Sequence, residues 1–289
     1  MVHIMEKHGN KSILDMNRRD WRSVTLWLSD GLNGTESDSK GRSNARVNRM
    51  RAACNSLCNY LENSDDYDYE INFSKKIAGL PKQRVKNDEN DFFFTFEEFI
   101  EVRRRLIEQE EWQIASFFSL AFDSGARRNE IWQVEKAGFY EENNIWTNTV
   151  VGKRRKEFKL MYLPDTRDIV LKWLSMRGDD DIKLLWVVGD GKYRKEATPE
   201  HLYSWIKKCS KILSDVRGEE CNIFVHTVRH SRAECLVSGQ DDRLKNPDGT
   251  NRVYSLNEVR LLLHHESVDV TQSYLRNHDD EILEGLFSI

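Results

Sequence analysis

Two short clusters combine cationic side chains in a way that suits a phosphate. Arg127 and Arg128 stand at the start of an expected helix, where the helix dipole disfavours cations but favours a bound anion. His226 and Arg229 are three residues apart and would share one face of a helix. An arginine can bind a phosphate through two hydrogen bonds and a histidine can transfer a proton, so the second cluster indicates phosphate chemistry.

A third cluster combines a histidine with a tyrosine. His265 precedes Tyr274 by nine residues near the end of the sequence. Taken singly, each cluster also has a structural explanation: a solvated arginine pair, an ordinary amphipathic helix, or a half-buried core tyrosine. It is their combination and order that point to chemistry.

A mainly helical chain must position these clusters. Thr95-Phe-Glu-Glu98 matches a capping box and begins a helical pattern that extends to residue 138. Residues 145–151 and 157–163 look like strands, and the polar residues between them predict a β-hairpin with a basic tip. Further helices are expected at about 166–176, 198–214, 226–238 and 256–264, with a polar loop at 239–254. The predicted fold class is mainly α with a small antiparallel β-sheet (α+β).

In this order and at this spacing, the clusters resemble the motifs of the tyrosine recombinases, also called phage integrases. The family motif G-L-R-x-S-E-L corresponds to Gly125–Ile131 and H-x-L-R-H-[ST] to His226–Ser231. The third motif, L-G-H-x(8)-Y, corresponds to Leu263-His-His265 followed by Tyr274. The resemblance covers about residues 93–276 and implies DNA strand transfer by tetramers on two double-stranded DNA sites.

The resemblance also implies a role for each group. Tyr274 would attack the phosphorus and form a 3′-phosphotyrosyl bond, with His226 as general base. A hairpin lysine, Lys153 or alternatively Lys156, would protonate the leaving 5′-oxygen, and His265 would donate a hydrogen bond to a phosphate oxygen. The bond energy stays in the phosphotyrosine, so no cofactor and no metal are expected. The implied catalytic set is Arg127, Lys153, His226, Arg229, His265 and Tyr274.

Four features depart from the family pattern. His264 replaces the usual glycine before the histidine of the third motif, and Arg232 replaces an apolar or aromatic residue. Arg128 adds a cation beside Arg127, and the loop at 239–254 looks longer than usual. None of these removes a catalytic group. Arg128, Arg232 and the loop could reflect altered DNA contacts.

Charge is distributed unevenly along a chain whose net charge is −4. Residues 1–86 carry 15 Lys+Arg against 11 Asp+Glu, a net charge of +4, and residues 87–289 carry 29 against 37, a net charge of −8. Phosphate binding needs local positive patches rather than a positive total. Two acid-free patches stand out: Lys40, Arg42, Arg46, Arg49 and Arg51, and then Lys75, Lys76, Lys82, Arg84 and Lys86.

The first patch coincides with an expected helix that begins near Ser43. Its apolar residues recur at intervals of three and four, and a second face carries the arginine triplet. The triplet consists of Arg42, Arg46 and Arg49. A solvated surface and a DNA-binding face are both consistent with this pattern. DNA contacts are also expected from Lys82, Arg84 and Lys86.

These patterns predict three parts: an N-terminal helical DNA-binding domain at 1–80, a linker at 81–92, and a catalytic domain at 93–289. The linker prediction rests on a proline, mixed charge and few apolar residues. The tail at 279–289 places apolar residues on one helical face, which would dock on a neighbouring protomer or on its own domain.

Other classes of protein are not indicated. The sequence has no apolar run of membrane-spanning length, and its N-terminal residues lack the apolar core of a secretory signal. A DNA-associated location in the cytoplasm of a bacterial or archaeal host is therefore expected. Cys54 and Cys58 fit an apolar helix face rather than a zinc site.

The sequence favours an active recombinase or integrase of a phage or mobile element. One alternative is a DNA-binding regulator, such as a repressor, that keeps the fold but no longer recombines. Another is a monomeric type IB topoisomerase, which shares the chemistry. The intact catalytic set favours the recombinase over the regulator. The separate N-terminal domain and the apolar tail at 279–289 favour it over the topoisomerase.

Overall fold

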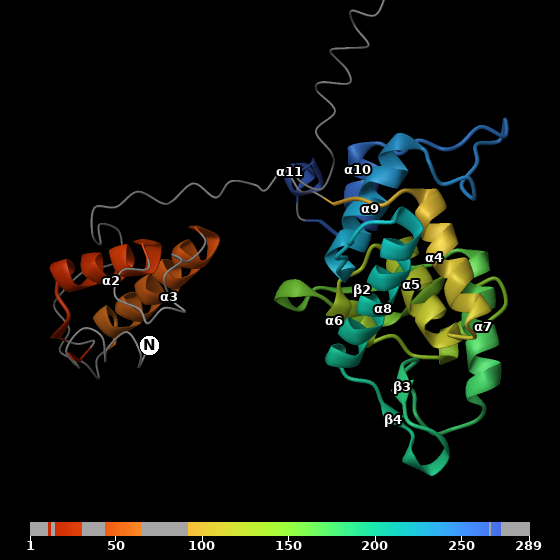
Figure 1. The fold of residues 1–289 in the computed structure, drawn as a ribbon, viewed down its shortest axis with the longest axis horizontal. Coiled ribbons are helices and arrows are strands. Elements are labelled where there is room, and N and C mark those ends of the chain that lie inside the picture. The colour runs from red at the N-terminus through yellow and green to blue at the C-terminus, as the bar shows by residue number, and fades with distance from the viewer. Residues whose placement is uncertain (1–10, 13–14, 31–43, 65–91, 266, 273–289) are drawn as a thin grey trace, which may run out of the picture. The chain divides into compact units, whose positions relative to one another are not determined.

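A computed structural model describes residues 11–12, 15–30, 44–64, 92–265 and 267–272 (Figure 1). The chain divides into two compact units, Met1–Asn90 and Asp91–Ile289. Within the described part of the chain, no helix is both long enough and apolar enough to cross a membrane.

The first unit contains two described helices, α2 (Arg18–Asp30) and α3 (Asn44–Glu62), which pack against each other. The helix predicted near Ser43 is confirmed as α3, and its apolar face is buried as expected. Cys54 and Cys58 lie in this core, where burial raises the pKa of the Cys54 thiol to about 11. Trp21 and Val24 of α2 cover them from the other side.

The second unit is mainly helical, as predicted. Its central helix, α5 (Trp112–Ser124), is buried at every position from Ile114 to Ser124, and most of these residues are apolar. Four longer helices contact it: α4 (Phe96–Glu108), α7 (Pro164–Arg177), α8 (Pro199–Arg217) and α9 (Val225–Ser238). Short helices complete the unit: α6 (Arg128–Trp132), α10 (Leu256–Leu262) and α11 (Val268–Gln272).

Helix α4 begins with the predicted capping box, in which Thr95 and Glu98 bind each other's backbone N–H groups. Phe99 of α4 stacks on Phe122 of α5, with ring centroids 3.9 Å apart. Helix α5 then ends at Gly125, whose φ of +55° is a left-handed conformation that favours glycine.

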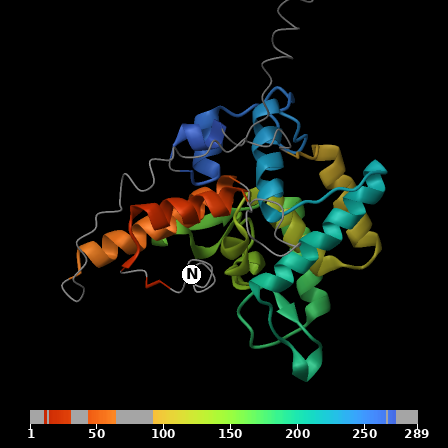
Figure 2. The same ribbon diagram turned by 60° about the vertical axis from the view of Figure 1, so that its left-hand side comes forward.

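The predicted hairpin is confirmed as strands β1 (Trp146–Val151) and β2 (Glu157–Met161), with Val151 opposite Glu157. Its turn places Arg154 and Arg155 at φ values of +59° and +60°. A second two-stranded sheet, β3 (Val187–Val188) with β4 (Lys195–Glu196), was not predicted, because strands of two residues show no alternation. This sheet lies at the opposite end of the unit from α10 (Figures 1 and 2).

Arg232 is not available for DNA contacts, which corrects the expectation from sequence. Its side chain is fully buried in α9 and forms an ion pair with Asp241. Asp241 also binds Arg243, which in turn binds Asp123 and Asp165. This network attaches the beginning of the loop at 239–254 to α5 and α7, so this part of the loop contributes to the stability of the fold.

Candidate active site

Arg127 is held in place by Glu130, one turn further along α6. The Arg127 backbone N–H donates to Oε2 of Glu130 at 2.7 Å, and its guanidinium donates to Oε1 at 3.0 Å. The Glu130 side chain is buried, whereas 36% of the Arg127 side chain remains accessible. A buried carboxylate therefore orients an arginine whose remaining N–H groups can reach an anion.

Arg229 is buried and joins three segments. From α9, its guanidinium donates to the carbonyl of Gly125 at 2.6 Å and to the carbonyl of Leu263 at 2.6 Å. Gly125 ends α5 and Leu263 ends α10. The first and third sequence clusters thus meet at the second, although Gly125 and Leu263 lie 138 positions apart in the sequence.

His226 is the second residue of α9 and is exposed. Its ring meets that of His230 edge to face, with centroids 4.7 Å apart. Crowding of the imidazole by protein atoms, and then the nearby His230, Arg229 and Arg127, lower the pKa of His226 to about 4. The ring is therefore neutral at pH 7 and able to accept a proton.

His265 is buried. Its Nδ1 lies 2.9 Å from Oγ1 of Thr271 in α11. Burial, followed by repulsion from Arg229 and Arg127, lowers the pKa of His265 to about 3. Arg127, His226 and Arg229 line one pocket, and Arg229 binds the carbonyl of Leu263, two residues before His265, so the four groups gather around one centre.

His264 has a structural reason to replace a glycine. Its φ is +55°, the left-handed conformation that glycine adopts most readily and that histidine adopts more often than most residues. Its ring stacks on Phe158 of β2 with centroids 4.0 Å apart. This contact connects the third sequence cluster to the hairpin.

The hairpin turn that carries the two lysines begins beside this centre. Both Lys153 and Lys156 are exposed in the turn, where Lys153 begins the 3₁₀ segment η5 (Lys153–Arg155). Burial and then the charge of Lys156 lower the pKa of His264. A Cβ added at Gly152 would lie 3.1 Å from Oε1 of Glu130. The base of the turn therefore lies against the carboxylate that holds Arg127, while the choice between the two lysines stays open.

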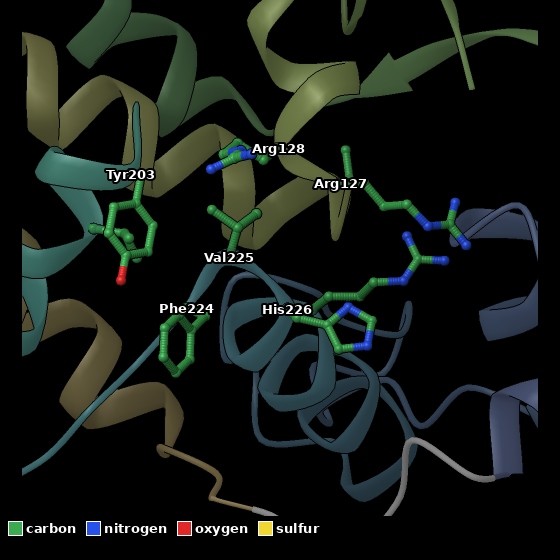
Figure 3. A pocket seen from close by; sticks show the side chains of 9 residues that line it. Arg127, Arg128, Tyr203, Phe224, Val225 and His226 are labelled. Atoms are coloured by element: carbon green, nitrogen blue, oxygen red, sulfur yellow. The ribbon is translucent and has the colours of Figure 1, made fainter. Parts of the chain in front are cut away.

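A pocket of about 360 Å³ opens beside the arginines (Figure 3). Arg127 and His226 point to one side of it, and Tyr203 and Phe224 form the other side. The aromatic side was not predicted from the sequence, because Tyr203 and Phe224 lie 21 positions apart in different elements. Arg229 also lines this pocket.

Several predicted residues are not described by the structure. Tyr274 and the second basic patch lie outside the described residues, as does Arg42 of the arginine triplet. The other two members, Arg46 and Arg49, are exposed on α3. The described residues include no group of three or more His, Cys, Asp or Glu side chains that could hold a metal ion.

No family model matches the sequence, and no curated protein matches it either. The fold, however, is similar to that of solved recombinases. The XerH site-specific recombinase, in a post-cleavage complex with a palindromic difH substrate, gives a TM-score of 0.66 at 20% identity over 98% of this chain and 76% of XerH.

Two integrases are similar as well. The Tn1549 transposon integrase, in complex with circular intermediate DNA, gives a TM-score of 0.60 at 12% identity over 98% of this chain and 90% of the integrase. A lambda integrase dimer bound to a COC′ core site gives a TM-score of 0.59 at 12% identity, covering 96% of this chain and 87% of that one. The fold of this protein is thus that of tyrosine recombinases, which confirms the predicted resemblance at the level of the fold.

Proposed function

We propose that this protein is a site-specific DNA recombinase that cuts and rejoins DNA through a 3′-phosphotyrosyl bond to Tyr274. The observation that carries the proposal is the meeting of Arg127, His226, Arg229 and His265 around one centre. They come from separate segments of a fold shared with recombinases and integrases that were solved on DNA.

The arrangement suits transfer of a phosphodiester. Arg127 and Arg229 would bind the non-bridging oxygens and stabilise the charge that develops in the pentacovalent transition state. The hydroxyl of Tyr274 would attack the phosphorus while His226, neutral at pH 7, takes its proton. His265 would donate a hydrogen bond to a phosphate oxygen from its Nε2.

The leaving 5′-oxygen needs a proton as its bond to phosphorus breaks. Lys153 would supply it from the hairpin tip, and Lys156 is the alternative. A 5′-hydroxyl from another strand then attacks the phosphotyrosine, returns the proton to the lysine, and releases the tyrosine, which recovers its proton from His226. Each bond broken is matched by one formed, so strand exchange needs no external energy source.

DNA binding and assembly complete the proposal. The two basic patches would hold phosphates outside the site, in a clamp formed by the N-terminal domain (1–80), the linker (81–92) and the catalytic domain (93–289). The tail at 279–289 would join neighbouring protomers in a tetramer on two DNA sites. An element that moves between DNA molecules, such as a phage, would be the source of an enzyme of this type.

The decisive test uses nicked suicide substrates that carry candidate sites. The wild-type protein should form a covalent adduct that survives a denaturing gel, and Tyr274→Phe should form none while binding DNA as before. Tyr193→Phe is the matched control, because Tyr193 is exposed in the β3–β4 turn. An adduct in Tyr274→Phe would assign the attack to another residue. Specific binding without any wild-type adduct would favour the regulator.

A further inference from the structure

The pocket beside the arginines has an aromatic wall that phosphate chemistry does not require. Tyr203 extends from α8, and Phe224 immediately precedes α9 (Figure 3). Each is 41% exposed. Their rings are nearly parallel, with an interplanar angle of 24° and centroids 6.3 Å apart. Two large rings side by side at the surface form an apolar patch, which commonly marks a binding site.

Cations accompany both rings. The Lys207 ammonium lies 4.7 Å from the centroid of Phe224 and 5.5 Å from that of Tyr203. Arg128 also lines the pocket, and its side chain lies on the Tyr203 side, whereas Arg127 lies on the His226 side (Figure 3). Aromatic faces combined with cations are what proteins use to bind the bases and phosphates of nucleic acids.

The pocket floor is apolar and continuous with the catalytic arginines. Ala126, Ile206 and Val225 line it together with the two rings. Its volume of about 360 Å³ lies at the lower end of the range for ligand pockets, and Arg127 and Arg229 belong to the same lining. A group bound in this pocket would therefore lie next to any phosphate that the arginines hold.

We propose that this pocket binds one unstacked base of the DNA strand, next to the phosphate held by Arg127 and Arg229. The base lies against Tyr203 and Phe224, while Lys207 and Arg128 bind oxygens of the base or of the adjoining phosphate. Aromatic stacking accepts every base, because every base has a π face. The inference rests on the proposed function, since it takes the ligand of the arginines to be a DNA phosphate.

The test measures the contribution of bases separately from that of phosphates. The probes are fluorescein-labelled oligothymidylate of about 12 nucleotides and an abasic oligomer of equal length and charge, both followed by fluorescence anisotropy. The wild-type protein should bind oligothymidylate more tightly, by roughly 5- to 100-fold. The double variant Tyr203→Ala/Phe224→Ala should lose most of this preference while keeping its affinity for the abasic oligomer.

Three further variants make the test specific. Tyr203→Phe keeps the ring and should keep the preference. Tyr193→Ala is the matched control, because Lys192 lies over the Tyr193 ring at 5.2 Å in the β3–β4 turn, at the other end of the unit from α10 (Figure 1). Lys207→Ala should weaken binding of both oligomers. Thermal melting checks that each variant is folded, and Phe224→Leu replaces the alanine variant if the latter is not.

Two results would overturn the base pocket. One is that the wild-type protein shows no preference for oligothymidylate over the abasic oligomer, and the other is that the double variant keeps this preference unchanged. This outcome is separable from failure of the proposed function, because anisotropy requires no cleavage. If the wild-type protein forms an adduct on the suicide substrate but the double variant keeps its preference for bases, the recombinase proposal stands and the base-pocket proposal is refuted. If the preference for bases depends on the two rings but no adduct forms, the base-pocket proposal stands and the recombinase proposal is refuted.

Discussion

Replacing Asp241 by asparagine should be among the most destabilising single changes in the second unit. Arg232 is fully buried, and Asp241 is the acid with which it forms an ion pair. Removing one member of a buried ion pair leaves a desolvated charge, which costs about 3–5 kcal/mol. Domains of this kind are stabilised by only about 5–15 kcal/mol, so the loss would be a large fraction of the total.

The converse change should cost less, which makes the prediction sharp. In Arg232→Met, Asp241 keeps its ion pair with Arg243 at 2.9 Å, so no buried charge is left alone. The double variant Arg232→Met/Asp241→Asn should therefore be more stable than Asp241→Asn. Because the two residues are in contact, their substitutions should depart from additivity by about 1–3 kcal/mol.

Chemical denaturation of the full-length protein, followed by circular dichroism, measures these differences. Glu101→Gln is the control: Glu101 pairs with Arg104 on the exposed surface of α4, and such pairs contribute about 0–1 kcal/mol. A cost below 1 kcal/mol for Asp241→Asn, or a double variant less stable than that single variant, would refute the reasoning.

Acid should weaken the same network. Burial acts to raise the pKa of Asp241, but hydrogen bonds from Arg243 and the charge of Arg232 lower it below its usual value of 3.8. The folded state thus holds this proton less tightly than the unfolded state. The ion pairs therefore stabilise the fold above about pH 4, and their contribution is lost as the pH falls through the folded pKa. Asp241→Asn should flatten this dependence.

Three other changes address the DNA-binding surfaces and the site. Replacing the arginine triplet by alanine should weaken DNA binding and lower its log–log salt slope by about 0.9 per lost phosphate contact; an unchanged slope and affinity would remove α3 from the clamp. Gly125→Ala would place a Cβ 2.3 Å from Leu263, so it should reduce adduct formation and stability more than Gly218→Ala, which is also left-handed (φ +71°, ψ 16°) but meets open space. Burial and then the charges of nearby His230, Arg229 and Arg127 hold the pKa of His226 near 4. A bound phosphate offsets the charges, so affinity should rise as the pH falls from about 6.5 towards 4, and less so in His226→Asn.

Local patterns in the sequence predicted most of the elements. The apolar spacing along α3 and the capping box at Thr95 are signals contained within a few residues, so tertiary contacts were not needed to find them. The order of the three clusters predicted the fold through the family resemblance, and the structure brings those clusters together at Arg229.

Long-range pairings could not be predicted in this way. Arg243 binds Asp123, which lies 120 positions earlier, and nothing in either local sequence indicates the other. A charged residue is exposed more often than not, so Arg232 was assigned to a possible DNA surface, yet a partner in a polar loop allows its burial. The pairing of Tyr203 with Phe224 could not be predicted either, because the two residues belong to different elements and neither local sequence indicates the other.

The hairpin shows a conflict between local preference and site geometry. A tight turn with two left-handed residues favours Asn-Gly, but this one contains Arg154 and Arg155, at a cost of roughly 1–2 kcal/mol each. The base of the turn is constrained, because a Cβ at Gly152 would lie 2.6 Å from the Phe158 ring, which itself stacks on His264. A strained tip on a fixed base can change conformation without disturbing the site, so we expect DNA to reorder the tip and bring a lysine to the leaving oxygen. Under the proposed function, arginine at both strained positions has a reason that turn preference alone does not give, since cations there would face the phosphates of DNA.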